Sequence, residues 1–313
     1  MWNILVSTLL IAGVAVVVGM LGYLFGKNRA VVLNGEVEVQ DGVGRDNEEE
    51  EKGKIKGEAI AEKLNRTILQ LFGKHIENDG SSVNYAGIAS DPLFSEYKAI
   101  AFKLREIELA ALPEEQWMCL LLNIYNALVI HGTVVLGVPS GMFGRLHFYA
   151  TVSYQIGDQI YSLDDIEHGL LRHNRKHPAP FYWNPQFYVG DPRMGSLAPA
   201  RHFDNRIHFA LVCGARSCPP VRVYTPACLN FGLRTAAEVF CRSNVEILVA
   251  ERTVRVSKLF QWYMSDFGED ERAMLRAISK WLLPEDQQQL HDLLDSPRTI
   301  TMAYHPYDWS LNE

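Results

Sequence analysis

Two cysteines in one short segment are the residues of this chain best suited to nucleophilic chemistry. Cys213 ends an apolar run that begins at Ile207, and Cys218 lies in the Gly-, Ser- and Pro-containing stretch that follows. This composition predicts a strand leading into a loop, where catalytic residues are often found. Four residues separate the two cysteines, whereas the common redox motif has two between them and a zinc site usually needs a second pair. The spacing alone therefore identifies neither site.

A thiol nucleophile needs a base, and two histidines are candidates. His208 lies five positions before Cys213, so in a regular strand the two side chains would point to opposite faces. Cys218, in the loop, could still fold back to His208. His168 is distant in sequence, but a nucleophile and its base usually meet through folding. We therefore predict His168 as the base for either thiol, with Glu167 or an amide orienting the imidazole.

The amides in question are Asn123 and Asn126, which lie within an apolar helical segment. At a spacing of three they share one face of a helix. Burying either amide without hydrogen-bond partners would cost roughly a few kcal/mol of stability, so each needs partners. They either fix loops over the core or orient a catalytic group. Glu167 has the same two interpretations, because it follows Asp164 at the spacing of a capping box.

Regular apolar spacing predicts three helices that precede any strand. Apolar residues recur every three or four positions at 59–72 and again at 97–109, as on one face of a helix. A third helix begins after Pro113, with two glutamates in its first turn, and continues to Val135. This third helix carries both amides and is apolar around most of its circumference, so we expect it to be buried.

Shorter segments with alternating apolar and polar residues predict the strands. Hairpins are expected at 154–161, around Gly157, and at 245–256, with further strands at 207–213 and 299–304. Helices and strands occur in blocks rather than in strict alternation. The sequence therefore predicts an α+β fold in which a helical N-terminal part packs on a mostly antiparallel sheet.

The N-terminus predicts a membrane anchor. The run from Ile4 to Phe25 is uncharged and, at about 1.5 Å per residue, spans the roughly 30 Å hydrocarbon core of a bilayer. We expect a transmembrane anchor with its flank at 1–29, a charged flexible linker at 30–57 and a single globular domain at 58–313. Lys27 and Arg29 favour a single-pass membrane protein with a cytosolic domain. The acidic residues further along the chain and the sequon at Asn65 oppose this topology.

Composition limits the partners. The net charge of -7 and the pI near 5.8 provide no basic surface for phosphates, so nucleic acid is not expected. The partners expected are the lipid bilayer and an unidentified protein or small molecule. Five cysteines are an odd number in a domain of this size, which favours unpaired thiols in a reducing compartment over a disulfide framework. No motif requires a cofactor or a metal.

Six ordered segments between about Ser81 and Asn312 resemble the family known as domain of unknown function 547. The segments are Val83-Asn-Tyr-Ala86, Asn123-Ile-Tyr-Asn-Ala-Leu128, Asp165-Ile-Glu-His-Gly-Leu-Leu-Arg172, His208-Phe-Ala-Leu-Val-Cys-Gly-Ala-Arg-Ser-Cys-Pro219, Tyr263-Met-Ser-Asp-Phe267 and Tyr307-Asp-Trp-Ser-Leu-Asn312. The chain departs from the family pattern at Leu121 and Leu122, where an aromatic pair is usual. The resemblance implies a shared fold and a set of site residues, but no reaction.

These observations support three hypotheses about function. The first is a thiol-dependent hydrolase or acyl transferase, with a site formed by Asn123, Asn126, Glu167, His168, Cys213 and Cys218. The second is a non-catalytic binding or scaffold module that recruits a partner to a membrane. The third is a zinc site that uses both loop cysteines and His168. The sequence leaves open whether the protein is an enzyme.

Overall fold

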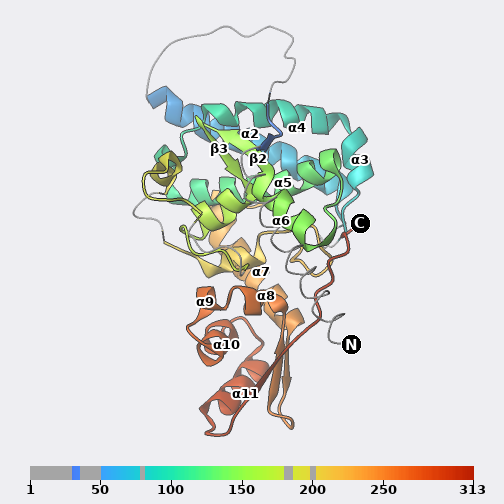
Figure 1. The fold of residues 1–313 in the computed structure, drawn as a ribbon, viewed down its shortest axis with the longest axis vertical. Helices are drawn as coiled ribbons and strands as arrows, with labels where there is room; N and C mark the ends of the chain where they lie inside the picture. Colours follow the sequence, from blue (N-terminus) through green and yellow to red (C-terminus); the bar gives the residue numbers. More distant parts are fainter. Residues whose placement is uncertain (1–29, 36–50, 78–81, 180–185, 198–201) are drawn as a thin grey trace, which may run out of the picture.

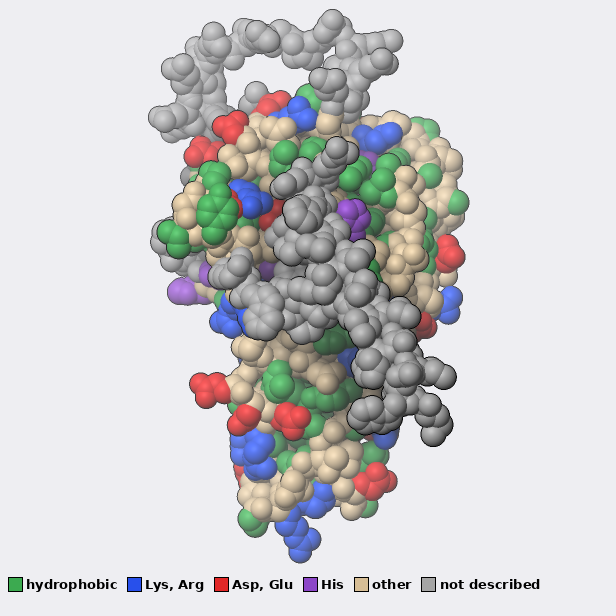
Figure 2. Space-filling model, viewed as in Figure 1, with side chains coloured by type: hydrophobic (Ala, Val, Ile, Leu, Met, Phe, Trp, Pro, Cys, Tyr) green, Lys and Arg blue, Asp and Glu red, His purple; other side chains and the backbone are tan. Residues whose placement is uncertain are grey.

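The computed structural model describes residues 30–35, 51–77, 82–179, 186–197 and 202–313, arranged in two lobes (Figure 1). The larger lobe contains α2 to α6 and the first sheet, and the smaller lobe contains α8 to α11 and the second sheet. The apolar run from Ile4 to Phe25 lies outside the described residues. Acidic and basic side chains are interspersed over the face drawn in Figure 2.

The centre of the larger lobe is α5 (Glu114–Leu136), whose side chains are buried from Trp117 to Thr133. The helix predicted after Pro113 is therefore confirmed, as is its burial. Within the described residues, α5 is the one helix long and apolar enough to cross a membrane, but 83% of its most apolar window is buried inside the fold. Such burial is typical of a core helix. The helices around α5 are α2 (Glu51–His75), α3 (Tyr85–Ser90), α4 (Pro92–Phe102) and α6 (Gly141–Thr151).

The first sheet has the order β1-β2-β3, with β1 (Val31–Val32) parallel to β2 (Val152–Ile156) and β3 (Gln159–Ser162) antiparallel to it. The hairpin predicted around Gly157 is confirmed, and this glycine has the positive φ of 56° that the tight turn requires. Part of the expected linker belongs to the fold, because β1 joins the sheet and α2 begins at Glu51.

The smaller lobe is built around a cluster of aromatic side chains. Its elements are α8 (Lys258–Trp262), α9 (Met264–Phe267), α10 (Glu271–Ser279), α11 (Pro284–Asp295) and a sheet of β4 (Val245–Leu248), β5 (Thr253–Val256) and β6 (Thr301–Tyr304). The hairpin predicted at 245–256 and the last strand are confirmed. Phe209 packs against Phe240 and Trp281, with ring centroids 5.2 Å away in both cases. The helix α7 (Leu229–Asn244) contributes buried side chains to the cores of both lobes.

Two predictions about the sheets are wrong. The fold is α+β, but each sheet has three strands with one parallel and one antiparallel pair, so the sheet is not mostly antiparallel. The segment 207–213 forms the short 3-10 helix η5 (Asn205–Phe209) and an irregular stretch rather than a strand. Asp204 explains the difference, because its carboxylate accepts from the N–H of Arg206 and starts a helical turn.

Asn34 shows how residues 31–35 are held. Its amide Nδ2 donates to the carbonyls of Ala101 (2.9 Å) and Gln155 (2.8 Å), and its Oδ1 accepts from the N–H of Gln155 (2.8 Å). We expect Asn34→Ala to lower the free energy of unfolding by about 2–4 kcal/mol, because it removes the hydrogen bonds to the backbone N–H and carbonyl of Gln155 and one of those to the carbonyl of Ala101, which keeps the N–H of Lys103. Urea denaturation of the full chain in detergent measures this change.

The control for this substitution is Leu69→Ala. Leu69 is 58% exposed on α2, so its truncation should change the stability by less than about 0.5 kcal/mol. Equal stabilities of the two variants would contradict the assignment of residues 31–35 to the folded domain.

Candidate functional site

Cys213 and Cys218 are joined by a disulfide, so the expectation of unpaired thiols is wrong for this pair. The chain reverses between them: Gly214 has a φ of 80°, and the N–H of Cys218 donates to the carbonyl of Ala215 (3.0 Å). Four intervening residues are enough for this turn, which a spacing rule based on redox motifs does not detect. The remaining cysteines, Cys119, Cys228 and Cys241, are not paired.

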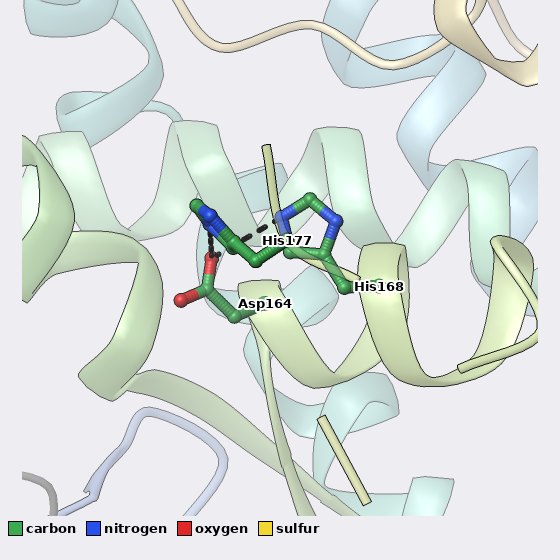
Figure 3. A group of neighbouring side chains, drawn as sticks. All are labelled: Asp164, His168 and His177. Carbon is green, nitrogen blue, oxygen red and sulfur yellow. Dashed lines mark ion pairs between the residues drawn. The ribbon is translucent and has the colours of Figure 1, made fainter. Parts of the chain in front are cut away.

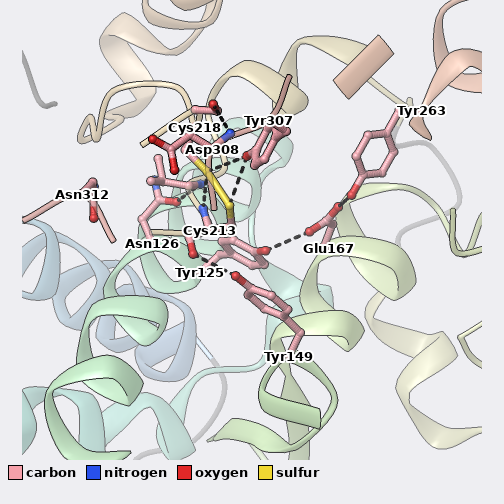
Figure 4. Close-up of a disulfide and its surroundings, with 12 residues drawn as sticks. Tyr125, Asn126, Tyr149, Glu167, Cys213, Cys218, Tyr263, Tyr307, Asp308 and Asn312 are labelled. Carbon is pink, nitrogen blue, oxygen red and sulfur yellow. Dashed lines mark hydrogen bonds between the residues drawn. A yellow bond between two sulfur atoms is a disulfide. The ribbon is translucent and has the colours of Figure 1, made fainter. Parts of the chain in front are cut away.

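Hydrogen-bond donors surround both sulfurs (Figure 4). The backbone N–H of Cys213 donates to Sγ of Cys218 (3.1 Å), and the hydroxyl of Tyr307 lies 3.4 Å from Sγ of Cys213 and 3.3 Å from Sγ of Cys218. Both cysteines are half-buried rather than enclosed. Donors at these distances would stabilise a thiolate if the disulfide were reduced, and Cys218 has one more of them than Cys213.

Asn126 holds the backbone that leads to the disulfide. Its Nδ2 donates to the carbonyl of Ala210 (2.9 Å), and its Oδ1 accepts from the N–H of Val212 (2.9 Å). The hydroxyl of Tyr149 donates to the carbonyl of Cys213 (2.8 Å). Asn126 therefore positions the cysteine loop from α5 without touching either sulfur.

Asn123 has a similar structural role at a different place. Its side chain exchanges two hydrogen bonds with the backbone of Tyr224 (2.7 and 2.9 Å) and donates to Oδ1 of Asn65 (2.9 Å). The loop-fixing interpretation of the two amides thus agrees with the geometry, and these hydrogen bonds of Asn123 go to Tyr224 and Asn65 rather than to the cysteine loop.

The C-terminal segment closes the cysteine loop from the other side. Ala215 forms an isolated antiparallel bridge with Leu311, and the N–H of Asn312 donates to the carbonyl of Gly214 (3.0 Å). The hydroxyl of Ser217 accepts from the N–H of Asp308 (2.8 Å). The loop is consequently fixed between α5 and residues 307–312.

Glu167 lies near this loop but bonds to tyrosines. Its carboxylate accepts from the hydroxyls of Tyr125 (2.9 Å) and Tyr263 (2.5 Å) (Figure 4). Burial and the nearby Glu167 charge raise the pKa of both phenols well above the usual value, so both remain donors. The predicted capping box is wrong: Asp164 makes no side-chain cap to the π-helix η3 (Asp165–Leu171).

A buried ion pair joins η3 to the smaller lobe. Nε and Nη2 of Arg172 donate to the carboxylate of Asp266 (2.7 and 3.1 Å), and Nε2–H of His208 donates to the same carboxylate (2.8 Å). Burial alone would raise the pKa of Asp266, but the hydrogen bonds from His208 and Arg172 hold it well below its usual range. Asp266 is therefore a buried, fully paired carboxylate.

His168 is bound to Arg172 rather than to a cysteine. Nη1 of Arg172 lies 2.8 Å from Nδ1 of His168, and because a guanidinium only donates, Nδ1 must be the acceptor. Burial, together with the charge of Arg172, lowers the pKa of His168 well below its usual value. The imidazole is neutral but its lone pair is occupied. The geometry therefore does not favour His168 as the base for a thiol.

Asp164, His168 and His177 form a cluster of the type that can bind a metal ion (Figure 3). Nε2 of each histidine lies 3.9 Å from Oδ1 of Asp164, beyond hydrogen-bond distance. However, Nδ1 of His177 accepts from the N–H of Ala179 (2.9 Å), as Nδ1 of His168 does from Arg172. Both Nε2 atoms then carry hydrogens, which a metal would have to displace.

The zinc hypothesis based on the cysteines also fails in this structure. Zinc binds thiolates, whereas the sulfurs of Cys213 and Cys218 are bonded to each other. His168 faces Asp164 and His177 instead of the cysteine loop.

Residues 109–241 match a family model described as a protein of unknown function, DUF547. The matched segment contains all six predicted site residues, and it supports the resemblance for the central part of the chain. No curated protein and no solved structure gives a significant match. The family description assigns no reaction.

Several residues of the site were not predicted from composition or spacing. They are four tyrosines near Glu167 and the sulfurs, namely Tyr125, Tyr149, Tyr263 and Tyr307, and the buried ion pair of Arg172 and Asp266. The sequence suggested His208 only as a base for Cys218 and not as a partner of Asp266. The signal that could have found the unpredicted residues is the resemblance itself, because all of them except Tyr149 lie in the matching blocks.

The buried ion pair leads to a stability prediction. Asp266→Asn leaves the guanidinium of Arg172 buried without a countercharge, so we expect a loss of about 3–5 kcal/mol in the free energy of unfolding. The matched control is Asp295→Asn on α11, because Asp295 pairs with Arg276 at an exposed position and should have little effect. Similar unfolding midpoints in urea for both variants would contradict this account.

The buried histidines lead to a prediction about pH. The pKa of His168 and that of His208 are lowered in the folded state, mainly by burial, so below pH 6.5 the unfolded chain binds more protons. Stability should be complete above pH 7 and should fall toward pH 5, by up to about 1.4 kcal/mol per pH unit for each such histidine. Urea denaturation at several pH values measures this slope.

Substitution separates this effect from other titrations. His168→Gln should reduce the slope between pH 7 and pH 5, whereas His202→Gln, at an exposed position, should leave it unchanged. A wild-type stability that is flat over this interval would contradict the neutral state assigned to the buried histidines.

Proposed function

We propose that the domain carries out thiol–disulfide exchange at the Cys213–Cys218 pair. The observation that supports this function is a half-buried disulfide whose sulfurs already have hydrogen-bond donors, with a backbone N–H and the Tyr307 hydroxyl at Cys218. A disulfide that serves only to hold the fold needs no such donors. A disulfide that is opened and closed does, because one sulfur must leave as a thiolate.

The reaction requires a dithiol partner. A thiolate of the partner attacks Sγ of Cys213, the disulfide bond breaks, and Cys218 leaves as the better stabilised thiolate. The second thiol of the partner, once deprotonated, then attacks the mixed disulfide and releases Cys213 as a thiolate, and the two cysteines take up protons. Two electrons and two protons thus pass from the partner, which becomes a disulfide, to the cysteine pair.

Acyl transfer or amide hydrolysis by the reduced cysteines is the first function predicted from the sequence. It needs a base beside the sulfur, and the basic nitrogen of His168 is bound to Arg172. Tyr307 is the side chain at the sulfurs, and burial raises the pKa of its phenol, which makes it a donor rather than a base. The geometry therefore favours exchange.

A non-catalytic scaffold is the second candidate, and a separate observation favours it. Asn123, Asn126 and Glu167 have their hydrogen bonds taken up by backbone groups and tyrosines of the same chain. The polar blocks of the sequence could then serve the fold alone, with the disulfide as one more structural link.

We also propose that the domain is attached to a membrane by the apolar run that ends at Phe25, with the domain on the cytosolic side. Cytosolic disulfides are usually transient and either catalytic or redox-sensing, which agrees with exchange. The sequon does not oppose this topology strongly, because Asn65 lies within α2 and accepts a hydrogen bond from Asn123.

Redox titration of the full chain against dithiol buffers tests the proposed function. We expect Cys213 and Cys218 to interconvert reversibly at a potential above about -300 mV, where exchange disulfides lie, and the fold to survive reduction. A pair that stays oxidised below that potential, or that unfolds the domain when reduced, would support the scaffold instead.

Two variants examine the individual steps. Tyr307→Phe removes a donor to the thiolate and should move the pH midpoint of Cys218 alkylation upward by about one unit. Tyr149→Phe, which loses a bond to the Cys213 carbonyl but leaves both sulfur donors, is the matched control. Cys218→Ser should trap a mixed disulfide between Cys213 and a partner supplied in its disulfide form, because the thiol that would resolve this bond is missing, and the absence of the adduct would exclude the proposed order of attack.

A further inference from the structure

The connection between α5 and α6 presents apolar side chains to solvent. Val135, Leu136 and Val138 are 50–53% exposed, and Met142 and Phe143 at the start of α6 are 52% and 43% exposed. These five residues, here called the apolar face, lie within nine consecutive positions. Exposed apolar side chains gathered in this way mark surfaces that contact a partner or a membrane.

Aromatic and basic side chains adjoin the apolar face. Arg145, on the same helix α6, places its guanidinium 4.3 Å from the ring centre of Trp309. Trp309 packs in turn against Tyr307 (4.5 Å) and Trp262 (5.5 Å) and is 39% exposed. Arg145 itself is half-buried. An exposed tryptophan and an arginine beside apolar residues are characteristic of proteins that insert at the interface between water and lipid headgroups.

The start of the described chain lies on the same part of the molecule. Val31 pairs with Val152, the residue that follows α6, so β1 begins beside the end of that helix. Six residues lead from Phe25 to Val31, which is a reach of at most about 20 Å. The helix α6 itself, with 11 residues, is about 16 Å long. A membrane that holds the apolar run would therefore lie within reach of the apolar face.

We propose that the apolar face, with Trp309 and Arg145 at its edge, rests in the headgroup region of a lipid bilayer. The inference uses the membrane anchor proposed above but not the cysteine chemistry. Apolar side chains contribute burial, and the guanidinium attracts anionic headgroups. Because Tyr307 contacts both Trp309 and the two sulfurs, this orientation holds the disulfide close to the membrane surface.

Site-specific photo-crosslinking of the full chain in liposomes tests this proposal. The liposomes contain phosphatidylcholine and phosphatidylserine, and benzoylphenylalanine replaces Phe143. The matched control replaces Phe231, an exposed phenylalanine on α7, and a second control replaces Val249 at the end of the β4–β5 hairpin, far from α6 (Figure 1). Lipid adducts, quantified by mass spectrometry, should be several-fold more abundant at position 143 than at either control.

Three outcomes would overturn the proposal. Equal adduct yields at the three positions would mean that no face is oriented toward the bilayer. Crosslinks from position 143 to residues 4–25 would mean that the apolar run itself covers the face, and crosslinks to a second copy would mean a dimer interface. Retention of the protein in the liposome fraction shows separately whether the membrane anchor holds, so its failure is distinguishable from that of the apolar face.

Discussion

The buried ion pair between Arg172 and Asp266 is the contact on which the geometry of the candidate site depends. Arg172 follows the π-helix of the larger lobe, and Asp266 precedes Phe267 in the core of the smaller lobe. Removing the two charges from water costs several kcal/mol for each ion, which is on the order of the stability of a small domain. The attraction between the charges offsets this cost only if the remaining hydrogen-bond donors and acceptors are also paired. Arg172 makes two hydrogen bonds to Asp266 and one to His168, and His208 donates to Asp266, so the charged groups are paired. The ion pair therefore favours the arrangement of the two lobes in which all of these groups are paired.

That arrangement determines what surrounds the cysteines. The backbone N–H of Arg172 donates to the carbonyl of Glu167, five residues earlier. The carboxylate of Glu167 accepts hydrogen bonds from one tyrosine of each lobe, Tyr125 and Tyr263. Tyr125 of that pair is adjacent in α5 to Asn126, which fixes the segment before Cys213. The sulfurs are thus linked to the buried ion pair through backbone and aromatic contacts, while remaining half-exposed to a partner.

The sequence predicted the long and regular elements well. The burial of α5, both hairpins and the last strand followed from apolar periodicity, because periodicity reflects the burial of one face or of the whole element. Periodicity failed at 207–213, where Asp204 starts a helical turn just before an apolar run. It also failed at residues 31–32, which pair in parallel with residues 121 positions further along the chain. Pairing over such a distance leaves no local pattern. For the site, the sequence identified the cysteines and Glu167 but not their partners, which come from separate segments of the chain.

The redox state of Cys213 and Cys218 in living cells tests the central claim most directly. Thiols are blocked with one alkylating reagent in intact cells, disulfides are reduced after lysis, and a second reagent labels the released thiols for mass spectrometry. The account predicts a mixture of both forms that shifts toward the dithiol under a membrane-permeant reductant and toward the disulfide under an oxidant, while Cys119 and Cys241 remain reduced. A pair that is entirely oxidised, or entirely reduced, under all of these conditions would contradict it.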